Sequence, residues 1–144
     1  MAADGLISLS SSHGPKDTMD RLAAEITARG MTVFARVDHA AGAAEAGLSL
    51  RPTELMIFGN AKGGTPLMQS EQTIGIDLPL KALVWQDASG RTWLSYNDPG
   101  WLAKRHVPGR RGRSGGQGHG CGAERDRHQG DRILIGARFP CRDL

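Results

Sequence analysis

The residues of greatest chemical interest lie at positions 59–66, the segment GNAKGGTP. This segment joins an apolar run to a candidate helix that Thr65 would cap and Pro66 would begin. N–H groups at a helix start lack partners inside the helix and carry partial positive charge. A lysine adds a full charge, and two glycines would let the backbone turn further N–H groups outward. The segment therefore predicts a cradle for phosphate or carboxylate. Its candidate ligand-binding residues are Asn60, Lys62, Gly63, Gly64 and Thr65.

The same segment also has a purely structural interpretation. Gly63 and Gly64 are what a tight turn between a strand and a helix requires where φ is positive. The segment is not the phosphate loop of nucleotide-binding proteins, because that motif places its lysine after the last glycine and here Lys62 precedes both. A small-anion site and an ordinary turn both remain open.

His39 and Asp77 form a second candidate group for chemistry. A histidine titrates near neutral pH and can act as a general base, and Asp77 would complete an acid/base pair if it faced the same cavity as His39 and Asn60. The simpler interpretation of Asp77 is that it caps or braces a turn. The chain has no Ser/His/Asp nucleophile pattern and no dinucleotide-binding fingerprint. We therefore expect a non-enzymatic binding or regulatory module, with a small enzyme using His39 and Asp77 as the alternative, and keep both residues as candidate ligand-binding residues.

The charge is divided unevenly along the 144 residues. Residues 1–106 hold 10 Lys and Arg against 11 Asp and Glu, whereas residues 107–144 hold 8 Arg against 4 Asp and Glu. The second stretch contains 9 of the 20 glycines and lacks apolar periodicity, which predicts a disordered tail or an out-of-frame product. An Arg-rich tail could bind nucleic acid, but within residues 107–144 no aromatic residue for base stacking precedes Phe139. Nucleic-acid binding is therefore the weaker alternative.

The cysteines and the hydropathy pattern argue against a metal-binding, a membrane-spanning or a secreted protein. Cys121 and Cys141 lie outside residues 1–106 and match no zinc-binding spacing, so we expect no metal and no cofactor. No apolar run reaches the roughly 18 residues of a membrane span, and the N-terminus lacks the features of a secretory signal. The expected location is the cytoplasm.

Apolar alternation predicts five strands, at residues 5–10, 31–37, 53–59, 80–86 and 91–96. Helical spacing predicts helices within 17–30, 38–47, 65–75 and 97–105. Asp17 or Thr18 would cap the first helix, Asp38 the second, and Asn97 or Asp98 the last. Gly30 and Gly47 would end the first two. We expect Val33, Ala35 and Val37 on one strand face and residues 53–59 at the centre of the sheet. The order predicts a single α+β domain over residues 1–106, a mainly antiparallel sheet with packed helices.

The last two strands form a hairpin whose connection ends at Gly90. Trp93 and Tyr96 have opposite parity on the second strand, so one should enter the core and the other should line a groove or a subunit contact. A core of this size is marginal, which favours a homodimer formed through a sheet edge or the hairpin.

Several unusual short motifs occur in a fixed order along the chain: DH followed by an Ala-rich turn, RPT, FGN, GTPLM, DLPL and YNDP. Together they resemble the domain-of-unknown-function family 302, small bacterial and archaeal proteins, over about residues 5–106. The resemblance implies a TATA-binding-protein-like fold of the β-α-β4-α kind and implies no activity. The chain departs from the family pattern at Ala61, where proline is common, and from Val107 onward.

Overall fold

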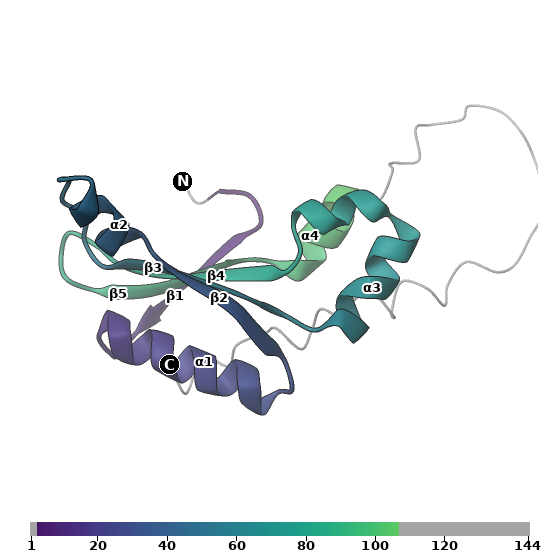
Figure 1. The fold of residues 1–144 in the computed structure, drawn as a ribbon, viewed down its shortest axis with the longest axis horizontal. Coiled ribbons are helices and arrows are strands. Elements are labelled where there is room, and N and C mark those ends of the chain that lie inside the picture. Colours follow the sequence, from purple (N-terminus) through teal and green to yellow (C-terminus); the bar gives the residue numbers. More distant parts are fainter. Residues whose placement is uncertain (1–2, 107–144) are drawn as a thin grey trace, which may run out of the picture.

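Five strands form one antiparallel sheet in the order β1-β5-β4-β3-β2 (Figure 1). The structure is a computed structural model that describes residues 3–106, so the predictions for the tail at 107–144 lie outside the described residues. The strands are β1 Leu6–Ser11, β2 Thr32–Asp38, β3 Thr53–Gly59, β4 Leu80–Gln86 and β5 Thr92–Asn97. The helices are α1 Pro15–Ala28, α2 His39–Glu45, α3 Ala61–Ser70, the 3-10 helix η1 Gln72–Ile76 and α4 Pro99–His106. The predicted α+β class and antiparallel sheet are confirmed, although the middle strand is β4 and not β3.

Helix α1 covers one face of the sheet and creates the core. Its stripe of Met19, Leu22 and Ile26 is fully buried. These side chains pack against alternate residues of the central strands: Met56, Phe58, Ala82, Val84, Leu94 and Tyr96. The helix begins at Pro15 after Gly14, so the predicted cap at Asp17 or Thr18 is wrong. Proline is well suited to the first helical position, so Pro15 sets an earlier start of the helix. Thr18 is therefore inside the helix, where it is buried and donates a hydrogen bond of 2.9 Å to the Gly14 carbonyl.

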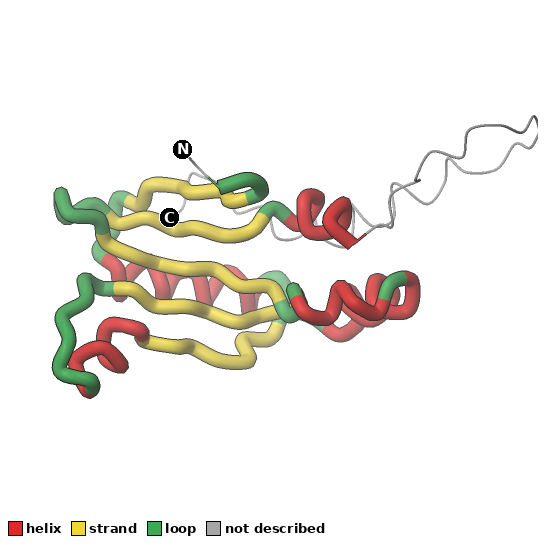
Figure 2. The backbone as a smooth tube through the Cα atoms, turned by 90° about the horizontal axis from the view of Figure 1, so that it is seen from above, coloured by secondary structure: helices red, strands yellow, loops and turns green. Residues whose placement is uncertain are grey.

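Within residues 3–106, no helix crosses the centre of the opposite face of the sheet (Figure 2). Trp85 and Trp93 stack there with ring centroids 6.1 Å apart. Their indole N–H groups donate to Ser95 and Asp87, each over 2.9 Å. Tyr96 lies in the core, which confirms that Trp93 and Tyr96 face opposite sides.

Strand β2 contains a bulge that the alternation pattern did not predict. Val33 pairs with Phe58, but the next paired residue is Ala35, which pairs with Ile57. Phe34 is the extra residue and stays 56% exposed. The predicted common face of Val33, Ala35 and Val37 is therefore wrong, because one inserted residue reverses the facing of everything after it.

The remaining helices lie at the two ends of the sheet (Figure 1). At one end Asp38 caps α2 by accepting a hydrogen bond of 2.9 Å from the Ala41 N–H, as predicted. At the other end α3, η1 and α4 follow one another in space, and Asp98 caps α4 through a 2.7 Å bond from Gly100. Positive φ at Gly30, Gly47 and Gly90 closes the predicted turns.

Candidate functional site

Asn60 starts α3, several residues earlier than the sequence pattern predicted. Its side-chain oxygen accepts a hydrogen bond of 2.9 Å from the Lys62 N–H. Its backbone carbonyl accepts from Gly63 at 3.0 Å and from Gly64 at 2.9 Å. The predicted cap at Thr65 with Pro66 at the first helical position is wrong: Asn60 is a strong cap, and Pro66 lies inside the helix.

This early start removes the predicted backbone cradle. The N–H groups of Lys62, Gly63 and Gly64 all have partners within the helix start. Neither glycine has a positive φ. The segment is therefore not a loop that presents bare N–H groups, and the charge it offers to a ligand is the side chain of Lys62.

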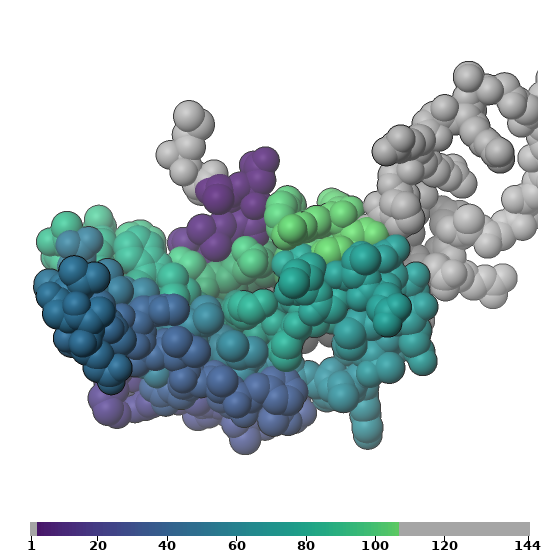
Figure 3. Space-filling view, turned by 45° about the horizontal axis from the view of Figure 1, so that its top comes forward, coloured from purple at the N-terminus to yellow at the C-terminus, as the bar shows by residue number. Residues whose placement is uncertain are grey.

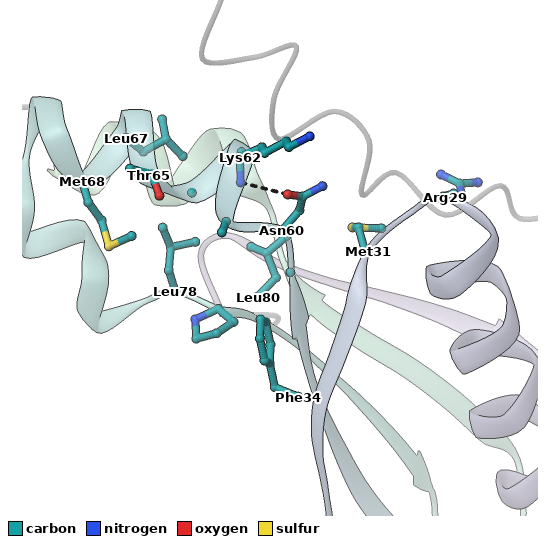
Figure 4. Close-up of a pocket in the computed structure, with 15 residues that line it drawn as sticks. Arg29, Met31, Phe34, Asn60, Lys62, Thr65, Leu67, Met68, Leu78 and Leu80 are labelled. Carbon is teal, nitrogen blue, oxygen red and sulfur yellow. Dashed lines mark hydrogen bonds between the residues drawn. The ribbon is translucent and has the colours of Figure 1, made fainter.

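A cavity of about 820 Å³ lies beside α3. The first turns of α3, the bulged end of β2 and the chain leading into β4 form its walls, and the surface is hollowed there in Figure 3. All five candidate residues of the segment 60–65 line this cavity. Side chains that the sequence did not single out make most of its wall: Met31, Phe34, Leu67, Met68, Leu78 and Leu80 (Figure 4).

The charged side chains around this cavity are basic. Lys62 and Arg29 line it, and no acidic side chain among the described residues does. Arg29 also bonds to Glu25 on its own helix over 2.7 Å, so part of its charge is balanced. Lys62 extends from the first turn of α3 (Figure 4). The arrangement gives an apolar cavity with a cationic edge.

His39 and Asp77 do not meet. His39 is the first residue of α2, exposed, at the end of the sheet remote from α3 (Figure 1). Neither residue lines the cavity, so the expectation that Asp77 faces one cavity with His39 and Asn60 is wrong.

Asp77 instead braces the turn after η1. One of its carboxylate oxygens lies 2.6 Å from His106 Nε2 and 3.3 Å from Arg105 Nη1, both on α4. Asp77 therefore joins the end of η1 to α4. Within residues 3–106 no group of three His, Cys, Asp or Glu is arranged to hold a metal ion.

The comparison with protein families decides what kind of chain this is. The model of a family described as a domain of unknown function, DUF302, matches residues 7–112. The chain belongs to the DUF302 family. A crystal structure of an uncharacterised conserved DUF302 protein from Bacillus stearothermophilus has the same fold, with a TM-score of 0.66, 22% identity, and coverage of 72% of this chain and 80% of that one. This confirms the resemblance found in the sequence and the fold that it implies.

The curated relatives of this DUF302 chain are longer proteins. It is 57% identical over 105 residues to a protein of Brucella suis named fluoride-specific ion channel FluC 1, covering 73% of this chain and 41% of that protein. Proteins of Brucella abortus and Brucella melitensis, named fluoride-specific ion channel FluC 1 and FluC 2, match equally over 39% of their length. The chain thus spans about two fifths of the length of these relatives. Among the described residues no helix is both long and apolar enough to cross a membrane.

Proposed function

We propose that this DUF302 domain is a non-enzymatic module that binds a small anionic ligand in the cavity beside α3. One observation carries the proposal: the cavity collects Lys62 and Arg29 at its edge and, among the described residues, no carboxylate. Residues 1–106 as a whole carry one more acidic than basic side chain, so the cavity is a basic site on a slightly acidic domain. A site of this kind attracts anions by charge complementarity.

The rival interpretations have less support. An acid/base enzyme needs His39 and Asp77 at one substrate, yet they stand at different ends of the sheet and Asp77 is held by His106. Nucleic-acid binding through the Arg-rich tail concerns residues outside the described part of the chain.

Thermal-shift measurements on the full chain test the anion proposal. Wild type should gain melting temperature with phosphate, nucleotides or small carboxylates, and Lys62→Ala should respond less, by about 1 kcal/mol of binding free energy. Lys104→Ala is the matched control, because Lys104 is exposed on α4 and does not line the cavity. If no anion stabilises the wild type, or if Lys62→Ala and wild type respond alike, the proposal fails.

A second candidate function is an accessory role beside a fluoride channel. The observation that favours it is the 57% identity with Brucella proteins named fluoride-specific ion channels, of which this chain matches about two fifths. The domain would then regulate a channel in response to the anion it binds. Removal of the matching region from the Brucella suis relative should change the dependence of fluoride efflux from proteoliposomes on added carboxylate. An unchanged dependence would exclude this role.

We also propose that the domain is cytoplasmic and self-associates. The absence of cysteine from residues 1–106 agrees with a reducing compartment. Self-association is supported by the open face of the sheet, where Val37 of the edge strand β2 is 39% exposed beside its partner Leu55 of β3. A sheet edge was one of the two contact regions expected from the sequence.

A further inference from the structure

The cavity beside α3 has a lining that is too apolar for a small inorganic anion. Its wall is made mostly of methionine, leucine, phenylalanine and proline side chains from several separate segments of the chain. Phe34, the extra residue of the β2 bulge, lines the cavity from the side of β2. A wall of this composition recognises a hydrocarbon body and not a hydrated ion.

Hydrogen-bond donors for a multiply charged anion are also scarce. A phosphate carries up to two charges and several acceptor oxygens, which must be satisfied if it leaves water. The N–H groups of Lys62, Gly63 and Gly64 are occupied by Asn60 and so are not free to supply these bonds. The cavity offers the ammonium group of Lys62, while the charge of Arg29 is partly balanced by Glu25. This arrangement matches a ligand with a single negative charge.

Gly64 extends the cavity at a point where a side chain would fill it. A Cβ atom placed there would lie 3.6 Å from Leu78 Cδ1 and 3.9 Å from Met68 Cε, ordinary van der Waals distances. The glycine is thus not required for backbone conformation or to avoid a clash. Its effect is to leave open the space between α3 and the segment before β4.

We propose that the ligand is an amphipathic monocarboxylate, with its carboxylate at Lys62 and its hydrocarbon body among Met68, Leu78 and Phe34. This inference rests on the proposed anion-binding function and specifies its ligand class. The volume of about 820 Å³ lies in the range of roughly 300–1,000 Å³ typical of sites for small organic ligands. The charge of Lys62 selects a carboxylate head group, and the apolar lining of the cavity selects a hydrocarbon tail.

Isothermal titration of the full chain with carboxylates of increasing length tests this inference. The probes are acetate, butanoate, hexanoate and octanoate, with inorganic phosphate and 1-octanol as the comparisons for charge alone and chain alone. Each added methylene that enters the cavity should tighten binding about threefold to fourfold. Octanol should bind more weakly than octanoate by about fivefold, and Lys62→Ala should abolish that difference.

Two glycine variants locate the site. Gly64→Leu should fill the cavity and remove octanoate binding, and the milder Gly64→Ala should weaken it in part. Gly42→Leu is the matched control, since Gly42 also lies in a helix, has open space where a Cβ atom would stand and does not line the cavity. Equal octanoate binding in Gly64→Ala and wild type, with both folded, would overturn the location.

The outcomes separate the two proposals. Binding that rises with chain length and depends on Lys62 supports both. Lys62-dependent binding of acetate or phosphate as tight as that of octanoate overturns the ligand class and leaves the anion function standing. Equal affinity for octanol and octanoate, or no binding of any probe, overturns both.

Discussion

The expected roles of Lys62 and Gly64 in ligand binding change because α3 begins directly after Asn60. The sequence pattern predicted that the glycines expose backbone N–H groups. In the structure these N–H groups are bonded to Asn60, so the ammonium group of Lys62 becomes the main attraction for an anion. The glycines contribute space rather than bonds.

This change leads to a prediction for Gly64. In the interior of a helix, with room for a Cβ atom, Gly64→Ala should raise the free energy of unfolding by up to about 1 kcal/mol, because alanine loses less backbone entropy than glycine on folding. Urea denaturation of wild type and variant measures the difference. A loss of stability would indicate that the backbone at Gly64 needs a conformation reserved for glycine, as the turn interpretation required.

At the scale of the elements, His106 makes the shortest contact between α4 and the Asp77 carboxylate at the end of η1. His106 has a side chain only 9% exposed and lies 2.6 Å from the Asp77 carboxylate. His106→Ala should lower the free energy of unfolding by about 1 kcal/mol and speed amide hydrogen exchange in α4. His39→Ala is the control, since His39 is exposed at the start of α2. Equal effects of the two substitutions would show that Asp77 does not hold α4 through His106.

The β4–β5 hairpin contains a carboxylate whose protonation should weaken the fold. The hydroxyl of Ser89 donates to Asp87 over 2.6 Å and the indole of Trp93 donates over 2.9 Å, and these bonds lower the pKa of Asp87 below its usual value. Because the folded pKa is depressed, the stability from this carboxylate is present above the unfolded pKa, roughly 4, and is lost as the pH falls through the folded value.

Asp87→Asn isolates this contribution. The melting temperature of wild type should fall more steeply below pH 4 than that of the variant, because the variant has no proton to gain at position 87. Differential scanning calorimetry between pH 7 and pH 2 measures both curves. Parallel curves over the whole range would contradict the role given to the Ser89 and Trp93 hydrogen bonds.

At the scale of the whole molecule, the sheet has one covered and one open face within the described residues. Helix α1 covers the first face (Figure 2). Val37, 39% exposed, pairs with Leu55 next to the core residue Met56 and so belongs to the second face. If the chain pairs through this face, Val37→Glu should shift the full chain toward monomer in sedimentation equilibrium, since a charge would have to be buried at the contact. Ala28→Glu, on an exposed position of α1, should leave the association unchanged. Wild type that remains monomeric at high concentration would exclude self-association.

The elements that short-range patterns specify were predictable from the sequence. Strands 53–59 and 80–86 match β3 and β4 in full, because continuous apolar runs bounded by turn residues have few other interpretations. The caps Asp38 and Asp98 and the turn glycines Gly30 and Gly90 were found for the same reason.

The cavity could be predicted only in part. Asn60–Thr65 were identified as one candidate site, but their backbone role was wrong because a strong asparagine cap outweighed the low helix propensity of two glycines. The apolar wall was missed, since Phe34 and Leu78 come from segments that are distant from residues 60–65 in the sequence. Neither position carries a local signal in a single sequence.

Ligand binding beside α3 can be tested residue by residue, by mapping chemical-shift changes on the backbone amides of the full, ¹⁵N-labelled chain titrated with octanoate. We expect the largest shifts on the cavity lining, at residues 31–34, 60–68 and 78–80, and expect Lys62→Ala to reduce them. Residues of α2 around His39 should remain unchanged. Shifts centred on α2 or on the open face of the sheet, or no saturable shifts at all, would contradict an anion-binding cavity beside α3.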